Sequence, residues 1–450
     1  MTTIRDIPEV AGLDAKTELV RIPPELDVPL SPRVRNLIDT PAFRRLAGIH
    51  QLGLVSLVYP AANHTRFEHS LGVYRLALLC LRRLSFDPRF TKTVRPAEAE
   101  LLIVAALLHD LGHWPFCHPI EDIRLPSVPS HELFANSFLL EGEIADVLRD
   151  DWQIHPRDVV TLLSKEPQDP ARRILANILS GPIDIDKMDY LARDSLHAGV
   201  PYGRNFDQSR LIGSLRLNEA GDGLAISEKG KTAAEMMVFA RYVMFSEVYW
   251  HHAVRAATAM FQRAFYMLHQ SLDMDSLFRE TESVVIQELQ NTAGQAGAAQ
   301  LLSGLFGPVR RLYKRLGQYT FWQDRELYQR LARRPYPHLA ACAERLAELA
   351  SQTLGCRIDA HEILFDAPPV TREVEFQVDV YDRRRDTYRR LDEVSPVVRS
   401  LARQQFDDYV KCVRIFAHPR IRDQLAAHKH LPQLVREAVD RCEGAPKKGP

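Results

Sequence analysis

The pattern of hydrophobic and polar residues predicts a mainly helical chain. Between residues 63 and 83, Phe67, Leu71 and Tyr74 repeat at helical spacing, so we expect an amphipathic helix there. The segment from Pro96 to Leu108 is hydrophobic on all sides, which is typical of a helix buried in a core. Further helical patterns cover residues 31–49, 130–139, 156–163, 171–179 and 231–272, and one more ends near Asp194.

Strand patterns are short. Hydrophobic residues alternate on both sides of a Gly-Asp-Gly turn at residues 221–223, which predicts a β-hairpin. Residues 311–352 are rich in arginine and have a helical pattern, residues 374–380 alternate as in a strand, and a capped helix is expected over residues 395–418. We therefore expect a mainly α fold with a small β-hairpin and a smaller α+β lobe towards the C-terminus.

A change in composition suggests where the chain divides. Residues 273–310 are polar and rich in Ala, Gln and Gly, unlike the sequence before them. We therefore expect an N-terminal segment (residues 1–30), a main helical domain (31–272) and a helical and α+β C-terminal region (273–450).

Composition and charge narrow the range of functions. The 58 basic and 58 acidic residues give a formal net charge of zero, which argues against non-specific nucleic-acid binding by the whole chain. Six scattered cysteines without a CxxC pair fit a reduced, cytoplasmic protein. The first residues lack a hydrophobic signal core, and no hydrophobic run approaches the roughly 20 residues of a membrane span. We expect no membrane association.

Histidine is concentrated in one part of the chain, where seven of the 17 histidines lie between His50 and His131. Two of them, together with two aspartates, would give imidazole nitrogens and carboxylate oxygens that suit a divalent ion such as Mn, Fe, Zn, Co or Ni. Four protein ligands would leave positions for water and substrate, as in a catalytic site. The candidate metal ligands are His69, His109, Asp110 and Asp186.

The step His109-Asp110 ends the hydrophobic helix, and Gly112 follows it. Adjacent side chains cannot converge within a regular helix, but at a helix end they can, and we expect Gly112 to release the backbone there. Each histidine taken alone is more often a hydrogen-bonded core residue than a ligand. The combination with the other motifs carries the metal hypothesis.

Four motifs together resemble one enzyme family. The segments "TRFEHSLGVYRLA", "LLHDLGHWPFCH", "SHELF" and "DIDKMDYLARD" are similar to those of HD-domain phosphohydrolases, and most of all to the deoxynucleoside triphosphate (dNTP) triphosphohydrolase branch. That branch includes bacterial enzymes and the mammalian sterile-alpha-motif/HD-domain dNTPase. The resemblance covers residues 39–272 and implies the HD-domain helical fold for residues 31–272. It also implies that the four candidate ligands hold a divalent ion (Mn, Fe, Zn, Co, Ni or Mg), with Mg accompanying the triphosphate.

The resemblance further implies the reaction and its residues. Such enzymes attack the α-phosphorus of a dNTP with water and release a deoxynucleoside and inorganic triphosphate. A general acid must protonate the departing 5′-oxygen, and we expect His113 to do so because a histidine pKa suits this task. His131 and Glu132 would support it as a relay. Without the resemblance, a capping pair after Ser130 would be about equally plausible, and the resemblance favours the relay. The residues that match positions around the scissile phosphate are His113, His118, Glu121, His131 and Glu132.

Substrate contacts also follow from the resemblance. Arg66, Lys187 and Arg241 would bind the triphosphate, whereas solvation at the surface is the usual fate of such cations. For Tyr190 and Tyr249 the alternative is ordinary core packing. The residues that match the nucleoside pocket are Gln51, Leu52, Tyr190, Asp194 and Tyr249.

Many relatives are activated by nucleotides bound between subunits. The segment "DTPAFRRLAGI" departs from the mammalian guanine-reading pattern at Arg44 and Ala47, so a different activator, a shifted pose or no activation stay open. At the position of a mammalian lysine, His252 would weaken a phosphate contact because imidazole is mostly neutral at pH 7. We expect a homo-oligomer, with a tetramer favoured. The allosteric candidates are Asp39, Arg44 and Val58.

Other functions stay open at this point. An HD-type phosphodiesterase, a nuclease on single-stranded nucleic acid, a (p)ppGpp-type hydrolase or a di-iron oxygenase would use a similar metal site. The zero net charge argues mildly against a long nucleic-acid substrate, which is therefore not favoured as a partner. A non-enzymatic binding module would require lost ligands, and all four are present.

Overall fold

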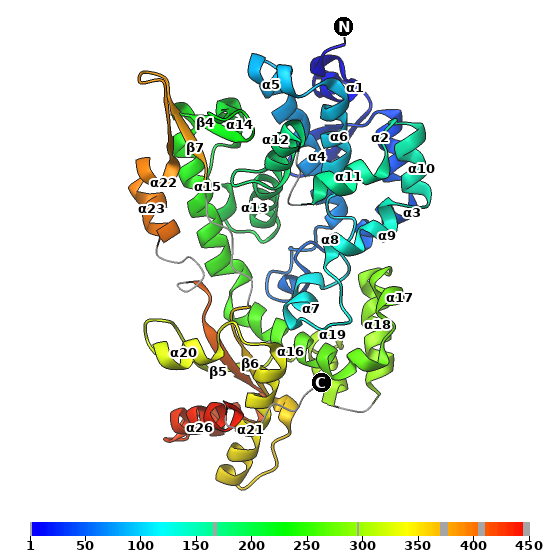
Figure 1. The fold of residues 1–450 in the computed structure, drawn as a ribbon. Coiled ribbons are helices and arrows are strands. Elements are labelled where there is room, and N and C mark those ends of the chain that lie inside the picture. The colour runs from blue at the N-terminus through cyan, green and yellow to red at the C-terminus, as the bar shows by residue number, and fades with distance from the viewer. Residues whose placement is uncertain (1, 165–168, 295–296, 370–376, 404–409, 444–450) are drawn as a thin grey trace. The chain divides into compact units, whose positions relative to one another are not determined.

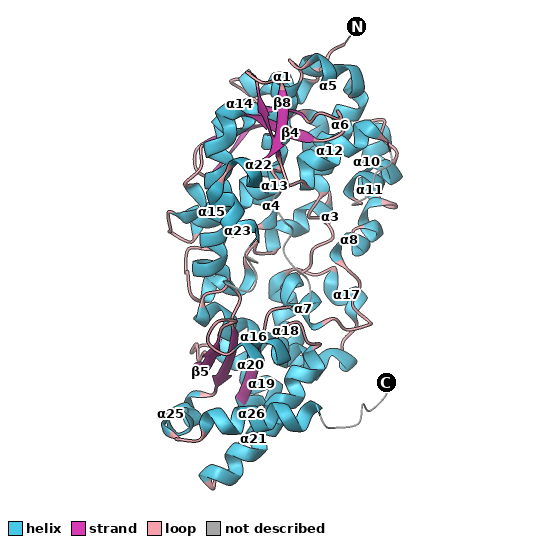
Figure 2. Cartoon of the chain, turned by 60° about the vertical axis from the view of Figure 1, so that its left-hand side comes forward, coloured by secondary structure: helices cyan, strands magenta, loops and turns pink. Residues whose placement is uncertain are grey.

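The structure is a computed structural model that describes the chain except for residues 1, 165–168, 295–296, 370–376, 404–409 and 444–450. The described residues are mainly helical and form three small β-sheets (Figures 1 and 2), which confirms the expected fold class. Two compact units are assembled from interleaved segments. The first comprises residues 1–115, 130–244 and 374–404, and the second comprises residues 116–129, 245–373 and 405–450. The linear division into residues 1–30, 31–272 and 273–450 stays a prediction.

The first unit is built around α6 (Pro96–Leu108), the helix expected to be hydrophobic on all sides. It begins with a proline at its first turn, and every residue from Leu101 to Leu108 is buried. Helices α4 (Arg66–Leu84), α11 (Pro156–Leu163) and α12 (Pro170–Ser180) pack against it. Burial on every side explains why the sequence of α6 lacks a polar face.

Helix α13 (Ile185–His197) packs against α4, α12 and α15 (Lys231–Met244) in the same unit (Figure 1). Its N-terminus is capped by Asp184, whose Oδ1 accepts a hydrogen bond from the Lys187 backbone N–H at 2.7 Å. The other helices of this unit are α1 (Pro8–Ala11), α2 (Pro32–Ile38), α3 (Pro41–Arg44), α5 (Pro88–Thr93), α8 (His131–Phe134), α9 (Asn136–Leu139), α10 (Glu143–Asp150), α14 (Gln208–Ser214), α22 (Leu391–Val394) and α23 (Pro396–Arg403).

The predicted hairpin is confirmed and belongs to a larger sheet. Strands β3 (Leu215–Leu217) and β4 (Leu224–Ser227) pair antiparallel, and β7 (Asp379–Asp382) joins β4 in parallel. Strand β8 (Thr387–Arg390) completes the order β3-β4-β7-β8. A separate hairpin is formed by β1 (Leu19–Ile22) and β2 (Leu26–Pro29).

The second unit places α16 (His252–Leu268) against α19 (Gly297–Phe306) and α7 (Cys117–Ile123). Its sheet has the antiparallel order β5-β9-β6 and packs on α21 (Tyr336–Leu354). The remaining elements of this unit are the strands β5 (Lys314–Tyr319), β6 (Ile363–Asp366) and β9 (Val413–Ala417), a π-helical turn (Phe245–Tyr249), and the helices α17 (Met274–Phe278), α18 (Glu282–Ala293), α20 (Arg325–Leu331), α25 (Pro419–Ala427) and α26 (Leu431–Glu443).

Several predicted helices were wrong in extent. The helix expected over residues 31–49 ends at Ile38, because Pro41 forces a break and disfavours helical geometry at the residue before it. The helix expected over residues 231–272 is interrupted after Met244 by the π-helical turn.

The predictions were also wrong where short strands replace helix. Residues 311–352 contain β5 before α20 and α21. In the segment 395–418, α23 is followed by β9, whose five residues are all buried. A short run that is hydrophobic on both faces cannot be distinguished from buried helix by its spacing. Of the expected strand 374–380, residues 374–376 lie outside the described residues.

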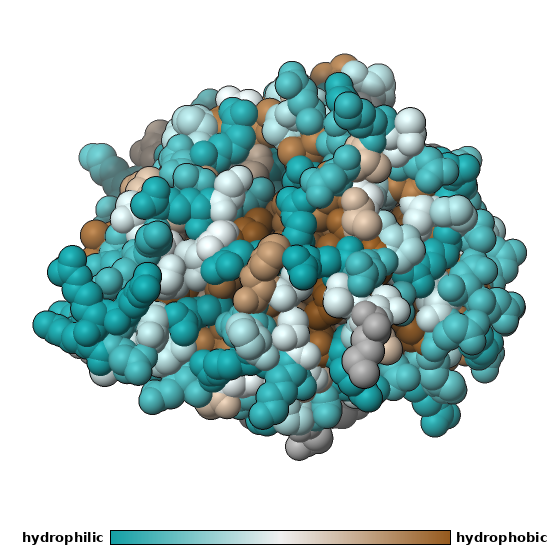
Figure 3. Space-filling view, turned by 90° about the horizontal axis from the view of Figure 1, so that it is seen from above, coloured by the Kyte–Doolittle hydropathy of each residue, from teal (hydrophilic) through white to brown (hydrophobic). Residues whose placement is uncertain are grey.

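None of the described helices combines the length and the hydrophobicity that crossing a bilayer would require. On the face shown in Figure 3, hydrophilic residues prevail and hydrophobic ones show between them. This matches helices such as α10, whose buried residues share one side.

Candidate metal centre

Three helices of the first unit bring the predicted metal ligands together. His69 lies in the first turn of α4, where Thr65 caps the helix. His109 and Asp110 follow the last residue of α6, and Asp186 lies in the first turn of α13. Because α4 packs against both α6 and α13, residues far apart in the sequence meet at the ends of these helices.

The donor atoms lie at distances that one ion can bridge. His69 Nε2 lies 3.1 Å from Asp186 Oδ1 and 3.2 Å from His109 Nε2, and His109 Nε2 lies 3.8 Å from Asp186 Oδ1. Asp110 is close by, with its Oδ1 3.5 Å from His109 Nε2. Two donors that each lie about 2.1 Å from one ion are roughly 3.0 Å apart at a right angle and about 3.4 Å apart at a tetrahedral angle. Three of the four predicted ligands, His69, His109 and Asp186, therefore converge on one centre, and Asp110 lies beside His109.

The tautomers of the two histidines leave two lone pairs facing each other. His109 Nδ1 donates to the Ala106 carbonyl at 2.9 Å, and His69 Nδ1 donates to Asp189 Oδ2 at 2.8 Å. In the neutral rings both Nε2 atoms then carry only a lone pair, and these atoms are 3.2 Å apart. Two such lone pairs repel unless a cation lies between them. The site is therefore built for a positive charge.

The pKa values of the site also indicate that it favours a positive charge. Burial disfavours the charged form of His69, but Asp186 and Asp189 outweigh this effect and raise its pKa to about 10. Burial likewise opposes ionisation of Asp110, yet the neighbouring His113 and Arg66 hold the pKa of that carboxyl well below its ordinary value. An imidazole and carboxylate set of this kind suits divalent ions of the late first row.

Asp110 also contacts two residues with predicted catalytic roles. Arg66 Nη1 donates to its Oδ2 at 2.7 Å, and His113 Nδ1 lies 3.1 Å from its Oδ1. The ring of His113 lies 3.9 Å, centroid to centroid, from that of His131. His131 Nε2 lies 3.8 Å from Glu132 Oε1. Three of the five predicted catalytic residues therefore form one row beside the metal ligands.

The role expected of Gly112 is corrected by the structure. Its φ is not in the left-handed region, so it does not release the backbone. A Cβ at this position would instead lie 2.1 Å from the carbonyl oxygen of His131 and 2.7 Å from the amide nitrogen of Ala135. Gly112 thus lets the start of α8 approach the end of α6, which places His131 beside His113.

The three predicted phosphate cations have different surroundings. Arg66 is buried and paired with Asp110, and its Nε donates to none of the described residues. Lys187 Nζ is held by Asp184 Oδ2 at 2.5 Å and by the Gly181 carbonyl at 3.1 Å. Arg241 is buried on α15.

The predicted sugar contacts of the first unit are partly buried. Asp194 lies on α13 with its Oδ1 2.9 Å from His64 Nε2. Tyr190 precedes it by one turn of the same helix and is half-buried. Gln51 and Leu52 are half-buried, and Gln51 Oε1 accepts no hydrogen bond from the described residues. A buried acceptor without a donor is costly, so Gln51 is suited to accept from a ligand.

Three predicted site residues belong to the second unit. His118 is exposed on α7, with Nδ1 3.6 Å from Glu121 Oε2. Tyr249 ends the π-helical turn before α16. The roles predicted for these residues stay predictions. The allosteric candidates lie in the first unit, where Asp39 and Arg44 are exposed and Val58 is half-buried.

Sequence reasoning missed Asp189 and Arg193, which lie directly behind the metal ligand His69. Arg193 donates from Nε and Nη2 to the two oxygens of Asp189, each at 2.8 Å. The available signal was their i,i+4 spacing on a predicted helix, which permits an ion pair. It could not show that the pair is buried or that it contacts His69.

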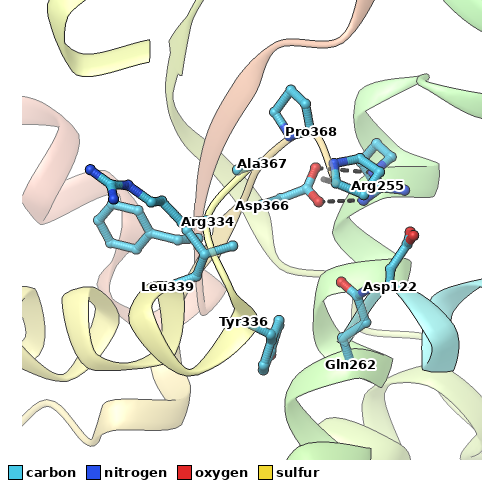
Figure 4. A pocket seen from close by; sticks show the side chains of 11 residues that line it. Asp122, Arg255, Gln262, Arg334, Tyr336, Leu339, Asp366, Ala367 and Pro368 are labelled. Carbon is cyan, nitrogen blue, oxygen red and sulfur yellow. Dashed lines mark hydrogen bonds and ion pairs between the residues drawn. The ribbon is translucent and has the colours of Figure 1, made fainter. Parts of the chain in front are cut away.

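The second unit has a polar pocket of its own, with about 330 Å³ of empty volume (Figure 4). Arg255 donates from Nε and Nη2 to the two oxygens of Asp366, at 3.1 and 2.5 Å. Burial raises the pKa of Asp122. Gln262, Arg334 and Tyr336 are further polar residues of the lining, and no sequence prediction falls on this pocket.

In comparisons with known proteins, two family models match successive parts of the chain. Residues 66–194 match the HD domain, and residues 206–431 match the HD associated region. An uncharacterized protein of Methanocaldococcus jannaschii is 31% identical over 379 residues, which cover 83% of this chain and 74% of that protein.

Two further relatives are an enzyme and a solved structure. The deoxynucleoside triphosphate triphosphohydrolase SAMHD1 of Gallus gallus is 28% identical over 341 residues, or 65% of this chain. The alignment spans 54% of that enzyme, about half of its length. A crystal structure of a hypothetical protein from Aquifex aeolicus is similar with a TM-score of 0.68 and 29% identity, covering 90% of this chain and 98% of that chain.

Proposed function

The chain belongs to the HD-domain phosphohydrolase superfamily, and we propose that it is a metal-dependent dNTP triphosphohydrolase. In this reaction a water oxygen bonds to the α-phosphorus, the bond from phosphorus to the 5′-oxygen breaks, and a proton moves to that oxygen. The products are a deoxynucleoside and inorganic triphosphate. Similarity to SAMHD1, which is named for this activity, supports the choice of substrate.

One observation carries the proposal. His69 Nε2, His109 Nε2 and Asp186 Oδ1 converge within 3.8 Å of one another, and both imidazoles direct bare lone pairs inward. Asp110 adds a carboxylate beside them. A bound divalent ion would polarise a phosphoryl oxygen and lower the pKa of water there. The four residues would hold Mn, Fe, Zn, Co, Ni or Mg, and Mg would accompany the triphosphate.

Proton transfer to the leaving group is assigned to His113. Its Nδ1 lies 3.1 Å from Asp110 Oδ1, and a protonated imidazole at this place would donate to the 5′-oxygen. The ring of His131 against that of His113, with Glu132 behind it, would restore the proton from the solvent side. We also propose that His118 and Glu121, which match positions around the scissile phosphate, contact the substrate.

Binding of the triphosphate is assigned to Arg66, Lys187 and Arg241. Arg66 has a buried Nε that can donate to a phosphate oxygen while Nη1 stays on Asp110. Lys187 would exchange Asp184 for the substrate. Such an exchange releases a cation only when a stronger anion arrives, which favours a polyphosphate over a neutral ligand.

Recognition of the deoxyribose is assigned to α13 and the loop before α4. Tyr190 would pack under the sugar, where a 2′-hydroxyl would clash. Gln51 Oε1 and Asp194 would accept hydrogen bonds from the 3′-hydroxyl. Leu52 and Tyr249 would complete the pocket.

We further propose a homo-oligomer, with a tetramer favoured, and a nucleotide activator bound between subunits. The surface positions of Asp39 and Arg44 and the partial exposure of Val58 leave them accessible to such a ligand. The alternative function is an HD-type phosphodiesterase or nuclease that acts on another nucleotide or on single-stranded nucleic acid.

The test is a matrix of substrates, metals and activators. The purified protein is incubated with each of the four dNTPs, GTP or single-stranded DNA, in the presence of Mn, Fe, Co or Mg, with and without a second nucleotide. Release of inorganic triphosphate from dNTPs but not from GTP supports the proposal. Shortened DNA, or no turnover of any dNTP under any of these conditions, rejects it. An Asp110→Ala preparation controls for contaminating phosphatases.

A further inference from the structure

A buried network of charged side chains contacts the metal ligand His69 on the side opposite to the metal centre. Asp189 is buried on α13 and its Oδ2 accepts from His69 Nδ1 at 2.8 Å. The same oxygen accepts from Arg193 Nε at 2.8 Å, and Oδ1 accepts from Arg193 Nη2 at 2.8 Å. His69 is therefore held on the side opposite to the centre by a carboxylate that is itself held by a two-pronged guanidinium contact.

This network of side chains extends to two half-buried residues, Glu68 and His197. Arg193 Nη1 donates to Glu68 Oε1 at 2.5 Å, and His197 Nε2 lies 3.0 Å from the same oxygen. Glu68 precedes His69 on α4, so the end of this network that is farther from His69 is attached to the same helix as the ligand. Both ends of the support thus move with His69, which limits rotation of its ring.

Gly72 shows that the backbone makes room for this pair. A Cβ at Gly72 would lie 2.0 Å from Asp189 Oδ1 and 2.4 Å from Arg193 Nη2. The guanidinium and the carboxylate therefore cross α4 directly over the glycine, one turn after His69. Any larger residue there would displace the pair without touching a metal ligand.

We propose that Asp189 is a positioning residue for the metal centre, with Arg193, Glu68 and Gly72 as the parts that hold it in place. It fixes the Nδ1–H tautomer of His69 and so keeps Nε2 available for the ion. A carboxylate on the outer nitrogen also makes the imidazole a better donor to a cation. The inference rests on the proposed metal centre and names no substrate.

The experiment measures metal binding by the full chain without nucleotide. Metal-stripped protein is titrated with Mn²⁺ by calorimetry, and the absorption spectrum of the Co²⁺-loaded protein reports the coordination geometry. Asp189→Asn and Gly72→Ala should each weaken Mn²⁺ binding by about 10- to 100-fold, the usual effect of removing the partner of a ligand. The Co²⁺ spectrum should change as well, which a merely structural role would not produce.

Two control variants match these changes. Asp158→Asn removes a carboxylate that pairs with Arg172 at 2.6 Å in the same unit, far along the chain from the ligands. Gly213→Ala adds a Cβ on α14 where no atom lies within 4 Å. Both controls should bind Mn²⁺ as the unaltered protein does.

Unchanged Mn²⁺ affinity and an unchanged Co²⁺ spectrum in folded Asp189→Asn would overturn the proposal. Should that variant fail to fold by circular dichroism, Arg193→Lys tests the same support. The lysine keeps the positive charge but cannot donate two parallel hydrogen bonds to Asp189. Wild-type Mn²⁺ affinity in Arg193→Lys would also overturn the proposal. Because no nucleotide is present, a protein that binds Mn²⁺ but leaves dNTPs intact would reject the proposed reaction and leave this test valid.

Discussion

The Nε2 atoms of His69 and His109 lie 3.2 Å apart, and each ring donates its other nitrogen to an oxygen acceptor. This arrangement is stable only with a proton or a metal ion between the two rings. Asp186 and Asp110 supply the negative charge that such a cation needs.

Removal of the Asp110 carboxylate should abolish metal binding and turnover together. Asp110→Ala takes away an oxygen donor and leaves Arg66 without its buried partner. We expect Mn²⁺ affinity to fall by at least about 100-fold, the upper range for disturbing even the partner of a ligand. Mn²⁺ should also raise the melting temperature of the unaltered protein but not of the variant. Equal Mn²⁺ content in both proteins, measured by mass spectrometry of the metal, would contradict the assignment of Asp110.

His113→Ala should separate metal binding from chemistry. The imidazole lies beside Asp110 but does not belong to the donor group of His69, His109 and Asp186, so Mn²⁺ content should stay at the wild-type level. Loss of a general acid should lower kcat by about 10²- to 10⁴-fold. His155, an exposed cap of α11, gives the matched control in His155→Ala, which should keep full activity. Loss of Mn²⁺ from His113→Ala would show that His113 has been given the wrong role.

Gly112→Ala should destabilise the first unit and disturb the row of histidines. The added Cβ would meet the His131 carbonyl at 2.1 Å, and a backbone atom in a packed turn cannot move away easily. We expect a loss of at least about 2 kcal/mol in the free energy of unfolding. Gly213→Ala, which meets open space in a helix, should be neutral or slightly stabilising. Equal urea midpoints for the two variants would disprove the close-approach role of Gly112.

The second unit should lose stability in acid through Glu362. Burial opposes ionisation of this residue, but the hydrogen bonds from Arg420 outweigh it and lower the pKa of Glu362 below its ordinary value. A carboxyl whose pKa is lower in the folded than in the unfolded state stabilises the fold at pH values above its unfolded-state pKa, which is about 4.3 for Glu. This contribution is lost as the pH falls towards the folded-state pKa. The stability difference between the wild-type protein and Glu362→Gln should therefore shrink below about pH 4.3. If the stability difference between the two proteins stays constant from pH 7 to pH 3 in denaturant titrations, the stabilising role of the Glu362 carboxylate is refuted.

Local sequence patterns were sufficient for the helices that carry the site. The hydrophobic run of α6 has the predicted bounds, Pro96–Leu108, because burial on every side leaves a clear signal. The combination of the motifs and their resemblance to HD-domain phosphohydrolases predicted four ligands that include Asp110. The structure brings three of them, His69, His109 and Asp186, together. Local patterns cannot show that α4, α6 and α13 lie together, so this part of the prediction came from recognising the motifs.

Features that depend on distant segments could not be predicted in this way. The parallel pairing of β4 with β7 joins residues 225–227 to residues 379–381, and no local pattern encodes such a partner. Likewise β9 is buried on both faces, so its spacing resembles that of a buried helix. The contact between Asp189 and His69 depends on the packing of α13 against α4 and was invisible in the sequence.

The products formed from dNTPs test the central claim most directly. The Mn²⁺-loaded protein is incubated with each dNTP in H₂¹⁸O, the reaction is stopped with EDTA, and the products are separated by anion exchange. The account predicts one inorganic triphosphate per deoxynucleoside, with ¹⁸O in the triphosphate because water attacks the α-phosphorus. Deoxynucleoside monophosphate with pyrophosphate, or no turnover of any dNTP with or without a second nucleotide, would contradict it.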